Sequence, residues 1–276
     1  IAHRGDLGCK RLYVWFHDQP ETHPHAAFLG DARSRVTRYV TLTETMARGY
    51  QEVHGLTPAR PLCGYFLPRA ALAPLPERLH EAPDVCYLSA PYRGLEILLT
   101  LWPEVRRRVP AATLRCAYGW QVHDTIALHE GGALTEQRRR IDRRFEELRD
   151  QGVQWLGRLP MRDVIGILDS SRVWAYPCVY PEMLSHVGQI AMARAAWPVL
   201  RPEAALRETV PGGRHVLDDL TQPAGVQAFA EALVEELARP AADMDAPRRA
   251  LREAALRRHE ATDQAWAEVL AADGIG

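Results

Sequence analysis

The sequence predicts an α/β protein built from βαβ units around parallel sheets. Short runs of β-branched and aromatic residues alternate with longer helical patterns along the 276 residues, as in parallel strands joined by helices. The chain is 47% hydrophobic and 25% charged, which provides apolar material for one large domain or two smaller ones. Because the formal net charge is only −1, no overall positive field favours nucleic acid or an anionic membrane.

Each element follows from a local pattern. Strands are predicted where short apolar runs are bounded by turn residues, at 11–17, 36–43, 61–66, 84–89, 112–118, 153–157 and 172–177. Helices are predicted where apolar residues recur at helical spacing, at 44–54, 94–108, 134–150, 161–169, 184–196, 223–238 and 245–271.

A connection between two domains is predicted at 67–82, which holds three prolines and no strand pattern. Only about three strands precede it, whereas a complete doubly wound sheet has about five or six. The first domain is therefore expected to be incomplete. We assign residues 1–72 to it, 73–240 to the second domain and 241–276 to a C-terminal helical segment.

The cysteines indicate a reducing compartment. They are Cys9, Cys63, Cys86, Cys116 and Cys178. An odd number of widely spaced cysteines in apolar runs fits reduced core thiols better than disulfides. No apolar run approaches the ~20 residues of a membrane span, and the start shows no signal-peptide pattern. We therefore expect a cytoplasmic protein without a transmembrane segment.

Three predicted βα turns carry residues suited to an anionic ligand, because the carboxyl ends of parallel strands meet helix N-termini there. Arg93 and Gly94 follow the strand at 84–89, Gly157 ends the strand at 153–157, and Glu182 precedes the helix at 184–196. A guanidinium beside free backbone N–H groups can clamp a diphosphate, although a plain surface arginine would give the same pattern. Glu182 alone could merely complement the helix dipole.

Taken in order, these segments resemble the donor-binding domain of retaining GT-B glycosyltransferases, of the family 4 or group 1 type. The resemblance rests on Arg93-Gly94-Leu95, the strands at 110–119 and 153–157, Glu182, and the run Ala191-Met192-Ala193 before Pro198-Val199. Upstream, RLYVWFHDQPE resembles the later part of the acceptor-binding domain. The resemblance implies a GT-B fold of two Rossmann-like domains with parallel sheets, the N-terminal one incomplete, as in a fragment or a reduced version.

The resemblance also implies site residues. Arg93 would bind the donor diphosphate and stabilise the leaving group, Glu182 would accept hydrogen bonds from sugar hydroxyls, and His17 would orient the sugar. Backbone N–H groups of Met183, Leu184 and Ser185 would cradle the phosphates. Other donor-site positions implied are Gly94, Gly119, Gly157, Arg158 and Ile190.

The implied reaction transfers a sugar, with retention, from a nucleotide sugar to an acceptor. The donor would be UDP- or GDP-linked and would be a substrate, so no cofactor and no metal are expected. The acceptor would be an unknown sugar, lipid or protein, and the protein could lie peripherally at a membrane. No nucleic-acid partner is expected.

One position departs from the family motif, which has a second glutamate eight residues after the first to hold the ribose. This chain has Ile190 there, and the neighbouring Gln189 points about 100° away on a helix. The nucleotide would then be read differently or bound weakly. Ile190 and the short first domain also allow an alternative, a non-catalytic relative that serves as a binding or assembly module.

A third hypothesis is a metal-dependent hydrolase, suggested by the segment HDQPETHPH. Its potential ligands are His17, Asp18, Glu21, His23 and His25. Such groups do bind metals, but prolines interrupt the segment and no second ligand cluster follows it in the sequence.

Overall fold

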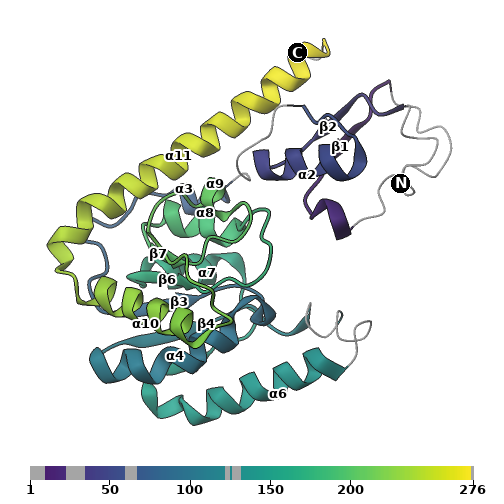
Figure 1. Ribbon diagram of the computed structural model, residues 1–276. Helices are drawn as coiled ribbons and strands as arrows, with labels where there is room; N and C mark the ends of the chain where they lie inside the picture. Colours follow the sequence, from purple (N-terminus) through teal and green to yellow (C-terminus); the bar gives the residue numbers. More distant parts are fainter. Residues whose placement is uncertain (1–9, 23–34, 60–66, 122–124, 126–131, 275–276) are drawn as a thin grey trace.

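The computed structural model describes residues 10–22, 35–59, 67–121, 125 and 132–274. Its strands form two parallel sheets, one of six strands in the order β5-β4-β3-β6-β7-β8 and one of two strands, β1 and β2. Figure 1 shows the two sheets in separate lobes, with the last helix running along both. We call the lobe of β1 and β2 the first region. The lobe of six strands contains the segments whose sequence resembles a donor-binding domain, and for that resemblance we call it the donor domain.

The six-stranded sheet contains a topological switch. Its strands are β3 (Asp84–Tyr87), β4 (Thr113–Cys116), β5 (Val153–Trp155), β6 (Val173–Tyr176), β7 (Trp197–Leu200) and β8 (Arg214–His215). From β3 the chain adds β4 and β5 on one side, and it then returns to add β6, β7 and β8 on the other. In such sheets ligands bind outside the carboxyl ends of the strands at the switch, which here lies between β3 and β6.

Helices cover both faces of this sheet (Figure 1). One layer contains α4 (Leu95–Arg108), α6 (Gly132–Glu147) and α10 (Pro223–Ala238), and the other contains α3 (Arg69–Leu72), α7 (Met161–Asp169) and α8 (His186–Ala193). The central strands β3, β6 and β7 are buried on both faces over most of their length, and Tyr87, Trp174 and Tyr176 are fully buried. Burial on both faces is what an all-parallel sheet requires.

The first region is smaller. Strand β1 (Tyr13–Trp15) pairs in parallel with β2 (Arg38–Val40), a short 3₁₀ turn η1 (Pro20–Thr22) follows β1, and helix α2 (Glu44–His54) follows β2. Thr43 caps α2 by accepting the Met46 N–H at 3.1 Å, and Gly55 ends it in the left-handed conformation.

Helix α11 (Ala241–Ala272) connects the two lobes. Arg248 and Arg252 donate to the backbone carbonyls of Ala195 and Ala193, which end α8 in the donor domain. At the other end, Asp273 accepts hydrogen bonds from Tyr13 at 2.8 Å and Arg38 at 2.9 Å. The C-terminal helix is therefore fixed at both ends by charged or polar contacts.

Most predicted elements are confirmed, and the bounds of α2, α7 and α10 are those predicted. The predicted strand at 61–66 lies outside the described residues. Helix α8 is shorter than the predicted 184–196, because Ser185 caps its start and Ala195 adopts a left-handed φ of 57° after its end. Strands β7 and β8 are absent from the strands predicted by pattern, and α3 interrupts the predicted connection at 67–82.

Two further predictions concern the thiols and the membrane. Cys86, Cys116 and Cys178 are free and buried, and burial raises the pKa of Cys86 to about 12 and of Cys178 to about 11. Cys9 and Cys63 lie outside the described residues. Within the described ranges, no helix is both apolar and long enough to cross a bilayer.

Candidate functional site

Arg93 and Glu182 meet at the topological switch. Arg93 ends η3 (Pro91–Arg93), the 3₁₀ turn that follows β3, and Glu182 lies in the loop that follows β6. The Arg93 Nη1 atom donates to Glu182 Oε2 at 2.6 Å. The fold thus brings together two residues that are 89 positions apart in the sequence.

Glu182 is held from several directions. The Tyr176 hydroxyl donates to Glu182 Oε2 at 2.8 Å, and the Ser89 hydroxyl donates to the Tyr176 hydroxyl at 3.3 Å. The Leu184 backbone N–H also hydrogen-bonds the carboxylate. Burial raises the pKa of Glu182, which is only 5% exposed, while Arg93 and Tyr176 oppose that rise. These hydrogen bonds therefore orient the carboxylate, but they offset only part of the cost of burying its charge.

Arg93 lies beside two aromatic rings, Tyr92 and Tyr180, which also contact each other edge to face. Its guanidinium carbon is 4.4 Å from the centre of the Tyr180 ring and 5.6 Å from that of Tyr92. Burial lowers its pKa and the Glu182 carboxylate raises it, with a net rise, so the guanidinium is charged. The Nε atom is buried and has no hydrogen-bond partner among the described residues, whereas about a quarter of the whole side chain is exposed. The cation can therefore still bind an anion.

Gly94 allows the two loops to approach. Its φ is 127°, and a Cβ there would lie 2.0 Å from the Pro177 carbonyl oxygen. Any side chain would separate the loop after β3 from the loop after β6. Gly94 is needed for the backbone geometry of the site.

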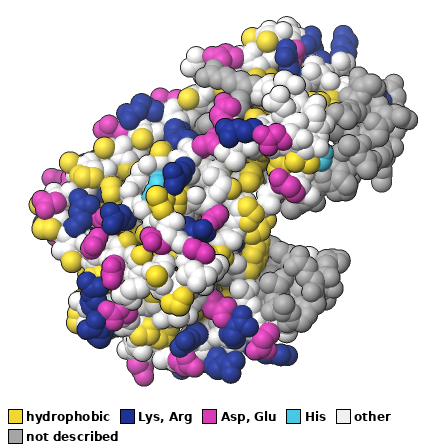
Figure 2. Space-filling model, viewed as in Figure 1, with side chains coloured by type: hydrophobic (Ala, Val, Ile, Leu, Met, Phe, Trp, Pro, Cys, Tyr) yellow, Lys and Arg dark blue, Asp and Glu magenta, His cyan; other side chains and the backbone are white. Residues whose placement is uncertain are grey.

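A small cavity of about 170 Å³ lies between the first region and this pair. One wall comes from His17, Asp18 and Gln19, and the other wall comes from Arg93 and residues 180–184. The Gln19 side-chain amide donates to the Pro181 carbonyl at 2.9 Å across the two lobes. Burial lowers the pKa of His17 against the opposing effect of Asp18, so the imidazole is neutral near pH 7. Figure 2 shows the molecule hollowed between the first region and the donor domain.

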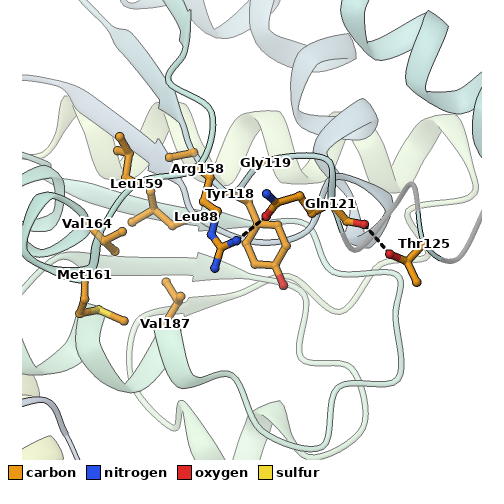
Figure 3. Close-up of a pocket in the computed structure, with 11 residues that line it drawn as sticks. Leu88, Tyr118, Gly119, Gln121, Thr125, Arg158, Leu159, Met161, Val164 and Val187 are labelled. Carbon is orange, nitrogen blue, oxygen red and sulfur yellow. Dashed lines mark hydrogen bonds between the residues drawn. The ribbon is translucent and has the colours of Figure 1, made fainter.

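A larger cavity of about 450 Å³ lies beside the pair in the donor domain. It is lined by Leu88, Ala117, Tyr118, Gly119, Gln121, Thr125, Arg158, Leu159, Met161, Val164 and Val187. Figure 3 shows Arg158 and Gln121 on one side of this cavity and Met161, Val164 and Val187 on the other. Arg158 donates to the Gln121 side-chain oxygen at 2.5 Å. The apolar wall and the polar edge suit a flat, partly polar ring system.

The structure brings several predicted site residues together. Arg93, Glu182 and His17 share the small cavity, and Gly119 and Arg158 line the large one. Gly119 and Gly157 adopt φ values of 97° and 66° in the turns that shape the large cavity.

Met183 and Leu184, whose backbone N–H groups are predicted to bind the phosphates, also line the small cavity. The side chains of Met183 and Leu184 pack into the core of the first region. Ser185 caps α8 by accepting the Gly188 N–H at 3.1 Å. The Leu184 N–H acts on the Glu182 carboxylate and lowers its pKa, and the phosphate contacts of residues 183–185 stay a prediction.

The predicted donor contact of Ile190 is not realised. Ile190 is fully buried in the main hydrophobic core, and it does not belong to the lining of the large cavity. Val187, three residues earlier on the same helix, lines that cavity instead. A spacing of three residues is nearly one helical turn, but α8 places only the earlier position at the cavity wall.

Sequence reasoning missed the tyrosines of the site. Tyr176 and Tyr118 end or directly follow strands β6 and β4, and Tyr180 lies in the loop before Glu182. Their position at strand ends was an available signal, but aromatic residues at such places are also common in cores.

The metal hypothesis finds no further support. Among the described residues, no group of three His, Cys, Asp or Glu side chains is placed to hold a metal ion. His23 and His25 lie outside those residues.

The arrangement of two facing α/β lobes, with a long C-terminal helix that joins them, is the GT-B fold of glycosyltransferases. Solved structures with this fold include TarM from S. aureus in complex with fondaparinux, alpha-GlcNAc-glycerol and UDP, with 11% identity, a TM-score of 0.67, and coverage of 94% of this chain and 50% of that one. HepE from Anabaena in complex with UDP and glucose matches with 15% identity and a TM-score of 0.70, over 95% of this chain and 72% of that one.

A UDP-forming alpha,alpha-trehalose-phosphate synthase from Burkholderia xenovorans matches with 14% identity and a TM-score of 0.68, over 96% of this chain and 68% of that one. Thus the chain spans between half and about seven-tenths of the length of these proteins. No protein-family model and no curated protein sequence matches it. The similarity confirms the predicted GT-B fold.

Proposed function

We propose that this chain binds a nucleotide-sugar donor and transfers its sugar to an acceptor hydroxyl. The observation that carries the proposal is the ion pair between half-buried Arg93 and buried Glu182 at the switch point of a GT-B fold, with one cavity on each side of it. Such a cation, which lies beside two aromatic rings, is suited to a diphosphate.

The two cavities suggest how the donor lies. The nucleoside would occupy the larger cavity, whose apolar wall can pack against a base and whose edge carries Arg158. The diphosphate would reach Arg93, and the sugar would enter the small cavity between Glu182 and His17. We favour UDP as the nucleotide because two of the similar structures are complexes with UDP, and GDP is the alternative to be tested.

In the proposed reaction, the bond between the sugar anomeric carbon and the phosphate oxygen breaks as the acceptor oxygen bonds to the same face of that carbon. The acceptor proton passes to the leaving phosphate, so no protein base is needed. Arg93 stabilises the charge that develops on the diphosphate, while Glu182 accepts hydrogen bonds from sugar hydroxyls. This route gives retention of configuration.

The alternative is a module that binds nucleotide sugars without transfer. Burial of Ile190 favours it, because the residue expected to meet the ribose belongs to the core. An enzyme would bind the donor and also separate the sugar from the nucleotide, whereas a binding module would bind the donor and leave it intact.

Calorimetry with UDP, GDP and UDP-glucose tests the proposal. Arg93→Ala should lower affinity for the preferred nucleotide about ten- to a hundredfold, because it removes a charge-assisted phosphate contact. Arg107→Ala is the matched control, since Arg107 pairs with Glu104 on the exposed side of α4. Equal binding by parent and Arg93→Ala, or no binding of any nucleotide by the parent, would contradict the proposed site. Release of UDP from UDP-glucose in the presence of candidate acceptors would then separate the enzyme from the binding module.

A further inference from the structure

The N-terminus of α2, in the first region, is bound by a side chain of the donor domain. Glu208, in the short helix α9 (Leu206–Thr209), accepts the Glu44 N–H at 2.9 Å and the Thr45 N–H at 3.0 Å. Its carboxylate also accepts the Thr45 hydroxyl. The Met46 N–H, the next along the helix, is accepted by the local cap Thr43. The first-turn N–H groups of α2 are therefore satisfied partly by Thr43 and partly by Glu208, a residue more than 160 positions away. A carboxylate at a helix N-terminus is favoured by both hydrogen bonding and the helix dipole.

A second, apolar contact joins the same two lobes. Leu184, from the loop after β6, packs with Phe16, Met46 and Tyr50 of the first region, and Met183 packs beside them. The two contacts differ in chemistry, but both fix α2 and the end of β1 against the donor domain.

The residues that make both contacts are connected to Glu182, either along the chain or through hydrogen bonds. Leu184 follows it by two residues, and its N–H meets the Glu182 carboxylate. The Ala205 N–H donates to the Glu182 carbonyl at 3.0 Å, and the Ala205 carbonyl in turn accepts the Glu208 N–H at 3.0 Å. Arg258 of α11 holds the Glu208 carbonyl from the other side. A short chain of hydrogen bonds therefore links Glu208, whose carboxylate binds the N-terminus of α2, to the backbone of Glu182.

We propose that Glu208 is an interdomain positioning residue, whose carboxylate fastens the start of α2 to the segment that carries Glu182 and so sets the separation of His17 from Glu182. The small cavity has one wall from each lobe, so its shape depends on this fastening. Among the described residues, the large cavity is lined by residues between 88 and 187 of the donor domain, so its shape does not depend on this contact. The consequence for the donor sugar rests on the proposed function, whereas the consequence for α2 does not.

Hydrogen exchange of the Glu44 and Thr45 amides tests the contact directly. In Glu208→Ala these amides should exchange at least about tenfold faster, because both lose their acceptor, while the amides of α4 should be unchanged. Glu208→Gln keeps an oxygen acceptor without the charge and should lie between the parent and Glu208→Ala. Glu235→Ala is the control, since Glu235 pairs with Arg214 on the exposed surface of the donor domain.

Affinity for UDP and for UDP-glucose tests the positioning role. Glu208→Ala should leave UDP affinity within about twofold and lower UDP-glucose affinity roughly tenfold, since only the sugar reaches the cavity between the lobes. A purely structural role would lower both affinities together with the melting temperature.

Unchanged exchange at Glu44 and Thr45, or an unchanged ratio of the two affinities in a protein that binds UDP, overturns the inference. A parent that binds neither ligand overturns the proposed function instead, and the exchange result alone then decides whether Glu208 fastens α2.

A variant on the other side of the contact covers the case in which Glu208→Ala does not fold. Thr45→Val keeps the shape of the side chain and removes the hydroxyl donor to Glu208. It should speed exchange in the same direction by a smaller factor. In the double variant with Glu208→Gln, the increase in exchange should be smaller than the sum of the two separate increases, because the two residues share one interaction. Fully additive increases would count against the contact.

Discussion

The donor domain and the first region obtain their hydrophobic cores in different ways. The donor domain packs six strands between two helical layers, and its core is formed by its own residues together with α11. Among the described residues, the first region has two strands, and its cores include Leu184 from the donor domain and Ala265 from α11. A two-stranded sheet is at best marginally stable alone. Docking therefore both completes the first region and forms the small cavity.

This difference separates the two halves of the candidate site. Arg93, Glu182 and the large cavity belong to the donor domain, whose geometry is fixed by its own core. His17, Asp18 and Gln19 reach the small cavity only because the first region is docked. Substitutions that weaken the docking of the first region should therefore alter the small cavity, whereas substitutions in the core of the donor domain should alter the Arg93–Glu182 pair and the large cavity.

The largest expected effect is that of a charge placed in the donor-domain core. Ile190→Glu should destabilise the protein by ~3–5 kcal/mol, because position 190 is fully buried in the hydrophobic core. Val187→Glu should cost much less, since Val187 lines a cavity. Thermal unfolding compares them, and a stable Ile190→Glu variant with tighter UDP binding would instead show that position 190 meets the ribose.

Loss of the apolar contact should weaken the first region selectively. Leu184→Ala removes a side chain that is only 8% exposed, at a cost of about 2–5 kcal/mol. Hydrogen exchange should increase in β1, β2 and α2 and remain slow in β3 and β6. Uniform loss of protection across both lobes would mean that they unfold as one unit.

Glu182→Gln should change how stability depends on pH. The pKa of Glu182 is raised in the folded protein by burial, so its stabilising contribution is fully present below the ordinary glutamate pKa and is lost as the pH rises through the raised value. The parent should therefore lose stability relative to Glu182→Gln as the pH rises above about 4, the ordinary glutamate pKa. Denaturant unfolding at several pH values measures this difference. If the parent instead gains stability relative to the variant as the pH rises, the attraction of Arg93 for the charged carboxylate outweighs the effect of burial.

Asp273→Asn should give the smallest effect, confined to the end of α11. Hydrogen bonds from Arg38 and Tyr13 lower the pKa of Asp273, so its contribution is present above the ordinary aspartate pKa and is lost only as the pH falls through the lowered value. At pH 7 the variant should show slightly faster exchange in β1 and β2, with no change in the donor domain. Equal acid sensitivity of the two proteins below about pH 4 would contradict this assignment.

The pattern of the sequence predicted much of the fold. Helical periodicity located α2, α7 and α10 with their bounds, because apolar residues that recur at helical spacing are a local signal. The short strand β8 has two residues and no pattern of its own, so it depends on pairing with β7. For the candidate site, Arg93 and Glu182 were identified from turns after predicted strands, and the ion pair between them could not be, because it joins residues on two crossing loops.

By itself the sequence determined most of the strands and helices in their order, apart from α3, β7 and β8. It also determined the two lobes and the positively and negatively charged residues that follow β3 and β6. Tertiary structure alone decided which side chains face the cavities. Ile190 and Val187 lie on one short apolar helix, and only the packing of α8 between β6, β7 and α11 buries the first and leaves the second at the cavity wall. Glu208 likewise has no sequence signal for α2, because a helix N-terminus accepts a carboxylate from any element that the fold brings within hydrogen-bonding distance.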